Sequence, residues 1–378
     1  MIFDLRTYII VGIFMIICIS LMIFNFVIIY YGQGRDTPSV SKIKKLKAIL
    51  CWESVLMFGA GPSHEKVLLK KLSNVADLVA YSDTLKRLKN NSPETYRDYI
   101  HNKYSTFQKL ADIYSRKHSI ERACYADFVS NFPEVAGMNK QMLDTLISYI
   151  YGSGVHCRVN VLRALCSIGS VSGVANALQV ISDSSLFIHD QILTNELLNF
   201  KGDKEILGDR LWDEGRHWND NVTVSVVQFI TSVSDYYGET FMPVLQNSST
   251  STEVRAAIIR YYGEHIYEPA RPVLIDFIIN STDVNLAIEA ASALALYPAP
   301  DTIAALKGAL SSSDWHVRYN ASNTLVRLKP KTQLLEILQG ESNYAREIVD
   351  YMLEQHVNPF SKAMKRVKLR EWIKHRIA

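Results

Sequence analysis

The sequence predicts an all-α protein, in which an α-solenoid of paired helices follows one N-terminal transmembrane helix. Two observations predict this fold class. A pattern of turn and amphipathic helix recurs at a mean spacing of about 32 residues, and residues 8–31 contain no charged side chain. Self-similarity at this period is typical of stacked helical units that pack only on their neighbours. An uncharged apolar run of this length is typical of a membrane-spanning helix.

The expected transmembrane helix has the sequence YIIVGIFMIICISLMIFNFVIIYY, residues 8–31. A helix of this length reaches about 36 Å, which is enough to cross a bilayer with modest tilt. Tyr8, Tyr30 and Tyr31 lie where interfacial aromatic side chains are expected. The alternative is a cleaved signal peptide, which would have a shorter apolar region and a small-residue cleavage site that does not follow Tyr31.

Basic residues lie on both sides of the acidic body of the chain. One arginine precedes the span and five Lys or Arg residues follow it within residues 32–47, while residues 360–378 contain seven basic residues and one acidic residue. The positive-inside rule therefore places the N-terminus outside and the large C-terminal part in the cytoplasm, on the inner (cytoplasmic) membrane. Because the whole chain has a net charge of only +3, the body between the basic ends is mildly acidic, which argues against a nucleic acid partner.

The basic ends are expected to contact an anionic membrane surface, since Lys and Arg near such a surface are attracted to it. The candidate residues are Lys42, Lys44, Lys45, Lys47, Lys365, Arg366, Lys368, Arg370 and Trp372. The cysteines have no paired spacing, which indicates a reduced compartment.

The chain is expected to have four parts. These are the transmembrane anchor at 1–31, a juxtamembrane linker with N-terminal helices at 32–92, the repeat solenoid at 93–357 and a basic amphipathic C-terminal helix at 358–378. The solenoid is expected to open with one long helix that starts at Ser92-Pro93, a typical helix start. Three interpretations of the C-terminal helix stay open: a polar cap on the solenoid, a membrane-surface helix or a docking peptide.

The clearest repeat is SDWHVRYNASNTLVRL, residues 313–328. Apolar residues from Val317 to Leu328 are spaced i, i+4, i+8 and i+11, which places them on one helix face. Asp314 is positioned to cap this helix. Before it, Pro298 and Pro300 end one helix and Asp301 is expected to cap the next, DTIAALKGAL. The predicted unit is therefore helix, turn, helix.

One residue just inside the second helix of each unit marks the register of the repeats. The marks are Arg122, Arg158, His189, Thr223, Arg255, Asn285, Arg318 and Arg346. Close copies of the pattern occur at 251–265 and 281–298, with looser copies at 118–132, 154–170 and 342–356.

The unit resembles the HEAT repeat family, and residues 313–328 are similar to the form found in bacterial HEAT and phycobilisome-lyase-type repeats. The resemblance covers about residues 93–357 and is clearest from 251 to 328. It implies ladders in which the Asp of the turn and the Arg of the second helix stack along the array. The positions that match are Asp314, Arg318, Glu253 and Arg255, whereas His189, Thr223 and Asn285 depart from the pattern.

No residue is predicted to be catalytic, to bind a cofactor or to ligate a metal. The histidines and cysteines lack metal-site spacing, and GAGPS (59–63) lacks the phosphate-loop pattern. The candidate partner-binding residues are Trp212, Arg216, His217 and Trp218, in a segment expected between repeat helices. Trp and Arg are frequent in binding hot spots. The favoured alternative is that both tryptophans fill the joint between units.

The predicted function is protein binding by a membrane-anchored cytoplasmic scaffold that is not an enzyme. Single-pass bacterial proteins that resemble this chain often accompany membrane glycosyltransferases of cell-surface polysaccharide synthesis, so the resemblance implies a glycosyltransferase partner. Ser20 and Asn25 are then candidates for hydrogen bonds between transmembrane helices. The alternative is a HEAT-type enzyme, similar to lyases that attach tetrapyrroles, with a pocket on the concave face.

Overall fold

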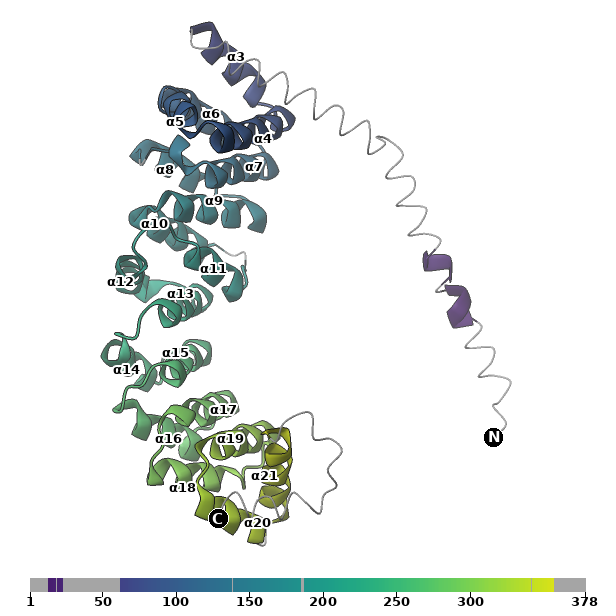
Figure 1. Ribbon diagram of the computed structural model, residues 1–378, viewed down its shortest axis with the longest axis vertical. Coiled ribbons are helices and arrows are strands. Elements are labelled where there is room, and N and C mark those ends of the chain that lie inside the picture. The colour runs from purple at the N-terminus through teal and green to yellow at the C-terminus, as the bar shows by residue number, and fades with distance from the viewer. Residues whose placement is uncertain are drawn as a thin grey trace. The chain divides into compact units, whose positions relative to one another are not determined.

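The computed structural model describes residues 13–17, 19–22, 62–137, 139–184, 187–340 and 342–356. Every regular element in these ranges is a helix, which confirms the all-α class (Figure 1). The chain divides into two compact units, residues 1–116 and residues 117–378. Residues 32–61 of the predicted juxtamembrane part at 32–92 lie outside the described residues, and so does the predicted C-terminal helix at 358–378.

The predicted span at 8–31 lies largely outside the described residues. Its described parts, 13–17 and 19–22, are helical and exposed, and Ser20 is among them while Asn25 is not. Within the described parts of the chain, no helix combines the length and the apolar character needed to cross a membrane.

The first unit contains α3 (Pro62–Leu72), α4 (Val75–Asn91), α5 (Pro93–His101) and α6 (Tyr104–Ser115). The expected single helix from Pro93 is wrong, because the chain turns at Asn102 and Lys103 and starts again as α6. The break lets the two helices bury separate apolar faces, Tyr96 and Ile100 on α5 and five residues on α6.

A buried polar chain crosses this unit. The Tyr81 hydroxyl donates to the Tyr99 hydroxyl at 3.0 Å, and His64 Nε2 lies 3.3 Å from the same oxygen. Burial lowers the pKa of His64, with a smaller contribution from the charge of Lys103. Burial also raises the pKa of Tyr99 to about 12. These neutral groups hold α3, α4 and α5 together.

The second unit contains the repeats. Its elements are α7 (Ser119–Asn131), η1 (Pro133–Val135), α8 (Lys140–Ser148), α9 (Val155–Ile168), α10 (Val171–Ser182), α11 (Asp190–Leu198), α12 (Lys204–Glu214), η2 (Gly215–His217), α13 (Asp220–Val233), α14 (Gly238–Gln246), α15 (Thr252–Glu264), α16 (Ala270–Asn280), α17 (Val284–Ala293), η3 (Leu294–Leu296), α18 (Pro300–Ala309), α19 (Trp315–Leu328), α20 (Lys331–Gln339) and α21 (Asn343–His356).

These helices form two layers, which Figure 1 shows as two columns. Odd-numbered helices from α7 to α21 each pack on the next odd-numbered helix and form the odd layer. Even-numbered helices from α8 to α20 form the even layer, in which close packing is interrupted between α12 and α14 and between α18 and α20. Each even helix from α8 to α20 also packs on the odd helix that follows it, except α10, which packs mainly on α9. This is the layered arrangement of an α-solenoid.

The register marks belong to the odd layer, as their spacing predicts. Seven of them lie inside odd helices, while His189 lies just before α11 and caps it by accepting from Gln191 N at 3.2 Å. Asp314 caps α19 as predicted, accepting from His316 N at 2.8 Å and Val317 N at 3.1 Å. The predicted cap at Asp301 is wrong, since α18 begins at Pro300 and its N-cap is Ala299.

Buried tyrosines join the two helices of a pair. The Tyr261 hydroxyl of α15 accepts from Tyr237 N, at the start of α14, at 2.8 Å. One pair further on, the Tyr297 hydroxyl accepts from Tyr267 N, which precedes α16, at 3.2 Å. Both rings are fully buried. Each hydroxyl therefore satisfies an amide at a helix start that no intrahelical partner reaches.

Candidate protein-binding surface

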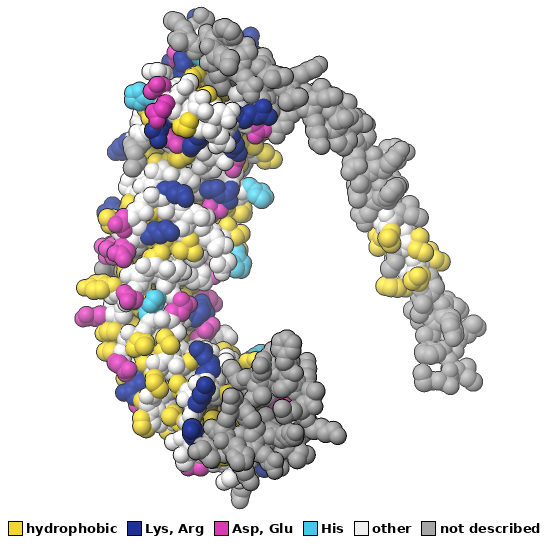
Figure 2. All heavy atoms as spheres, viewed as in Figure 1, with side chains coloured by type: hydrophobic (Ala, Val, Ile, Leu, Met, Phe, Trp, Pro, Cys, Tyr) yellow, Lys and Arg dark blue, Asp and Glu magenta, His cyan; other side chains and the backbone are white. Residues whose placement is uncertain are grey.

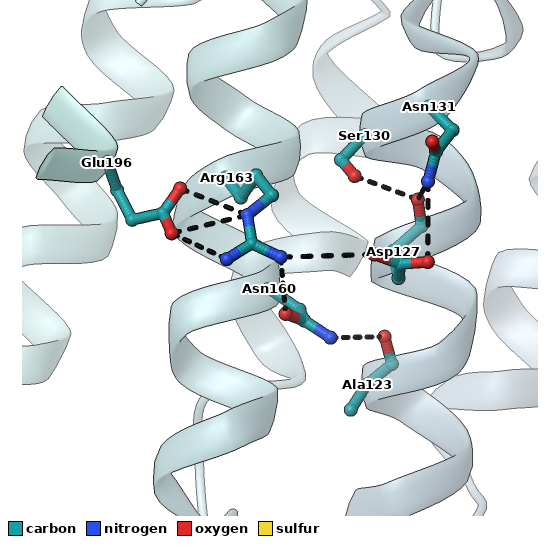
Figure 3. A network of polar contacts seen from close by, with 7 residues as sticks. All are labelled: Ala123, Asp127, Ser130, Asn131, Asn160, Arg163 and Glu196. Carbon is teal, nitrogen blue, oxygen red and sulfur yellow. Dashed lines mark hydrogen bonds and ion pairs between the residues drawn. The ribbon is translucent and has the colours of Figure 1, made fainter. Parts of the chain in front are cut away.

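Side chains of the odd layer are bonded from one repeat to the next (Figure 3). Arg163 on α9 donates to Glu196 on α11 from Nη2 at 2.6 Å and from Nε at 3.1 and 3.2 Å. Arg163 Nη1 also lies 3.9 Å from Asp127 of α7, and Asn160 donates to Ala123 O at 3.1 Å. The Glu196 side chain is only 9% exposed. Three successive odd helices therefore share one charge-assisted network.

Comparable bonds continue along the layer. Thr194 of α11 donates to Gln228 of α13 at 3.0 Å, and Gln228 donates to Asp190 at 2.8 Å. Further on, Arg260 of α15 pairs with Glu289 of α17 at 2.7 Å. The sequence analysis did not predict these contacts. Residues of opposite charge one repeat apart, such as Arg163 and Glu196, could have indicated them.

The register arginines do not build the ladder that the resemblance implies. Arg255 Nε donates to Leu245 O at 3.0 Å, and Arg318 Nη1 donates to Ser312 O at 2.7 Å and Ser313 O at 2.9 Å. The carbonyls belong to the end of the preceding helix or to the turn after it. These arginines therefore stabilise the turn between the two helices of one repeat. Their long side chains donate to carbonyls that no backbone amide satisfies.

One contact between repeats does involve a turn aspartate. Thr252 Oγ1 donates to Asp283 Oδ2 at 2.7 Å, while Asp283 Oδ1 caps α17 by accepting from Asn285 N at 2.9 Å. The hydrogen bond from Thr252 lowers the pKa of Asp283, and the charge of Arg255 adds to this shift. Glu253 is exposed.

A groove of about 590 Å³ runs across the exposed surface of the odd layer from α11 to α17. It is called the acidic groove below. Its lining consists of Phe187, Asp190, Asp220, Asn221, Val224, Thr252, Glu253, Ala256, Arg260, Asn285 and Glu289. Four carboxylates thus face one guanidinium, and that guanidinium is already paired with Glu289. Phe187 adds a large exposed ring at 68% exposure. Such a surface favours cationic ligands.

A second hollow, of about 460 Å³, opens where α12 and α14 separate, and it is called the tryptophan pocket. It is lined by Leu211, Trp212, Gly215, Trp218, Asp220, Thr223, Val226, Pro243, Val244, Asn247, Ser249, Thr250, Ser251 and Val254. Asp220 also lines the acidic groove, so the two hollows adjoin at the start of α13.

The two tryptophans of this pocket differ in their surroundings. Trp218 is 6% exposed, and its Nε1 donates to Gln179 of α10 at 2.7 Å. Its ring lies over Gly215, where a Cβ atom would come within 2.9 Å of it. Trp212 lies inside α12 and not between repeat helices as predicted; it is half-buried and packs edge-on against Phe241 of α14 at a centroid distance of 4.7 Å. Trp218 thus fills the joint between units, whereas Trp212 also presents a face to the pocket.

The other predicted site residues lie in several places. His217 is exposed in η2, and the Arg216 side chain lies outside the described part of the structure. All nine membrane-surface candidates lie outside the described residues as well. The proposed roles of these residues in binding stay predictions.

The described residues show no grouping of the side chains that usually ligate metals or act as thiolate nucleophiles. No group of three or more His, Cys, Asp or Glu side chains in the described ranges is placed to hold a metal ion. Cys124, Cys157 and Cys166 are free thiols, and burial raises the pKa of each. A raised pKa suppresses the thiolate, so burial makes these cysteines poor nucleophiles.

Comparison with known families decides what these paired helices are. The family model for HEAT repeats matches residues 271–349, which correspond to α16 through the first half of α21. The chain contains HEAT repeats. This confirms the predicted HEAT-like family, and HEAT repeats typically form non-enzymatic scaffolds that bind other proteins. No curated protein matches the chain.

Proposed function

We propose that this HEAT-repeat protein is a membrane-anchored cytoplasmic scaffold that docks a protein partner on its odd layer. The observation that carries the proposal is the acidic groove, because it crosses four repeats on one continuously packed layer. Rigid stacked helices with adjacent hollows offer an extended binding surface that needs little reorganisation. Figure 2 shows charged side chains of both signs with apolar side chains between them on the second unit.

The described part of the predicted span supports a membrane anchor. Residues 13–17 and 19–22 are helical, and their large apolar side chains are 52% to 73% exposed (Figure 2). Exposed apolar surface of this kind is unfavourable in water and favourable in lipid. Alkaline extraction of membranes tests the anchor: the chain should stay in the membrane fraction, and its release would refute the anchor. Protease added outside intact cells should leave the solenoid uncut.

A membrane glycosyltransferase of surface polysaccharide synthesis is the partner class that we propose. The HEAT-repeat family supports a protein partner, and the uncharged apolar run at residues 8–31 supports a partner at the membrane.

Site-specific photo-crosslinking in cells tests the docking surface. A photoreactive residue replaces Phe187 or Asn285 in the acidic groove, and the matched control replaces Ile279, an exposed even-layer residue of α16. The groove positions should crosslink to one membrane protein and Ile279 should not. Equal crosslinking from Ile279 would refute the odd-layer surface. Loss of sugar incorporation in groove variants would support the glycosyltransferase, and unchanged incorporation would refute that partner alone.

A further inference from the structure

We propose that the basic C-terminal segment, residues 360–378, docks in cis on the acidic groove and places Trp372 in the tryptophan pocket. The occupant comes from the chain itself, so a protein partner that docks on the same groove would have to displace it, and the inference does not depend on the identity of that partner. It rests on three features: the charge of the groove, the apolar pocket beside it and the composition and reach of the C-terminal segment.

The first feature is unbalanced charge. Asp220 and Glu253 are exposed at the starts of α13 and α15, and within the described residues neither has an ion-pair partner. Glu289 and Asp190 are held in place by bonds to Arg260 and Gln228. The groove therefore presents fixed carboxylates with only one lining cation. Residues 360–378 contain seven basic residues and one acidic residue, so the two surfaces are complementary.

The second feature is the pocket. Trp212 and Val254 line it from opposite sides of the separated joint, and Asp220 lies where it meets the acidic groove. A ligand that fits both hollows needs a large apolar side chain flanked by cations. Trp372 meets this description, because Arg370 and Lys374 each lie two residues from it. A tryptophan in such a pocket buries a large area and acts as an anchor.

The third feature is reach. The last described residue of α21 is His356, and three odd-layer steps of about 10 Å separate α21 from α15. Returning along one helix is a displacement of about 20 Å at right angles to these steps, so the straight-line distance is roughly 35 Å. The sixteen residues from His356 to Trp372 span up to about 53 Å when extended. The segment is therefore long enough to reach the pocket of its own chain when it is largely extended, and not as one continuous helix over 358–378.

Photo-crosslinking of the full-length chain in detergent tests the proposal. A photoreactive residue at position 372 should crosslink within one chain to the segments 211–226 and 243–254, at a yield that does not depend on protein concentration. Crosslinks between two copies would overturn docking in cis. Crosslinks to detergent alone, or to any other part of the chain, would overturn the proposed site.

Charge reversal supplies the second readout. In a chain whose Lys365, Arg366, Lys368 and Arg370 are replaced by Gln, so that the tethered segment no longer competes, the change Asp220→Lys/Glu253→Lys should weaken binding of a labelled peptide of residues 358–378 about tenfold, since each exposed pair changes from attraction to repulsion. The matched control is Glu239→Lys/Glu264→Lys, two exposed glutamates of α14 and α15 outside both linings, which should have little effect. Equal losses in the two variants would overturn the site.

Competition within the chain is measured with the same peptide. A full-length variant in which Lys365, Arg366, Lys368 and Arg370 are replaced by Gln should bind the peptide at least about tenfold more tightly than the natural chain, because a tethered segment competes at high effective concentration. Equal affinities of the two full-length chains would overturn docking in cis. The Glu239→Lys/Glu264→Lys control shows that the charge-bearing surface still folds.

Discussion

The odd and even layers differ most between α11 and α15. On the odd side, α11, α13 and α15 pack directly on one another, and Thr194 and Gln228 are bonded across the first step. On the even side, α12 packs on α10 but not closely on α14, and the tryptophan pocket occupies the gap. The comparison indicates that contacts within the odd layer hold the repeats in their stack. In the even layer, α12 and α14 are separated, which leaves space for a ligand.

The sequences of the helices explain this difference. α13 buries eight residues, including Val226, Val227 and Phe229, so it has apolar contacts on both sides. α14 has only nine residues, buries three of them and contains Pro243 in its interior. Proline removes an amide donor and disturbs the helix before it. A short helix of this kind cannot fill the space beside α12.

The largest expected effect is a difference in the loss of unfolding free energy when an aromatic ring is removed from each layer. Phe229→Ala on α13 removes a fully buried ring and should lower the free energy of unfolding by roughly 3–5 kcal/mol. Trp212→Ala removes a half-buried ring beside an existing hollow and should cost about 1–2 kcal/mol. Guanidinium unfolding followed by circular dichroism measures both. A larger loss for Trp212→Ala would show that the even layer maintains the stack.

The second effect concerns ion pairs. Glu196→Ala should cost about 2 kcal/mol, because Glu196 is nearly buried and holds Arg163 with three hydrogen bonds. Arg163 is 41% exposed, so water compensates part of its loss. The matched control is Glu214→Ala, which breaks the pair with Arg210 on the even helix α12 and should cost less than about 0.5 kcal/mol. Equal losses of unfolding free energy in the two variants would mean that ion pairs stabilise the odd layer no more than the even layer.

The period and the cap of α19 could be predicted from the sequence, whereas the predicted cap of α18 was wrong. The spacing of the register marks placed the odd helices correctly, because an apolar stripe on a repeated helix must face the same neighbour each time. Asp314 was found because a capping aspartate acts locally. The network of Arg163 and Glu196 was also accessible in principle, since its partners lie 33 residues apart, near the repeat length.

The grooves and the arginine contacts could not be predicted, for physical reasons. The role of Arg318 depends on whether its long side chain reaches an aspartate of the next repeat or a carbonyl of its own turn, and sequence spacing permits both. The tryptophan pocket depends on the separation of α12 and α14, which the sequence of either helix does not specify. The difference between Trp212 and Trp218 follows from the η2 turn, which directs Trp218 onto α10.

A smaller effect is expected from helix capping in the two layers. Asp314→Ala removes the acceptor for two amides at the start of the odd helix α19 and should cost about 1 kcal/mol. Asp301→Ala in the even helix α18 removes an exposed pair with Arg271 but no cap, and should cost at most about 0.5 kcal/mol. Thermal unfolding of both variants measures the difference. A greater loss for Asp301→Ala would show that it caps α18 after all.

The smallest expected effect is a pH dependence at the contact between Thr252 and Asp283. Because the hydrogen bond from Thr252 lowers the folded-state pKa of Asp283 below its ordinary value of 3.8, the unfolded chain binds more protons than the folded chain in that range. The stabilisation is therefore present above about pH 4 and is lost as the pH falls through the folded-state pKa. Asp283→Asn retains a good N-cap residue and removes only the charge.

The difference in unfolding free energy between the natural chain and Asp283→Asn should accordingly shrink as the pH falls from 6 to 3. The matched control is Asp276→Asn on the even helix α16, whose carboxylate accepts only from Asn280 of the same helix among the described bonds. Its difference should stay nearly constant, because it joins no two repeats. A constant difference for Asp283→Asn as well would mean that the aspartate contributes only as a cap. The odd layer would then be held across this step by packing and by Arg260 with Glu289.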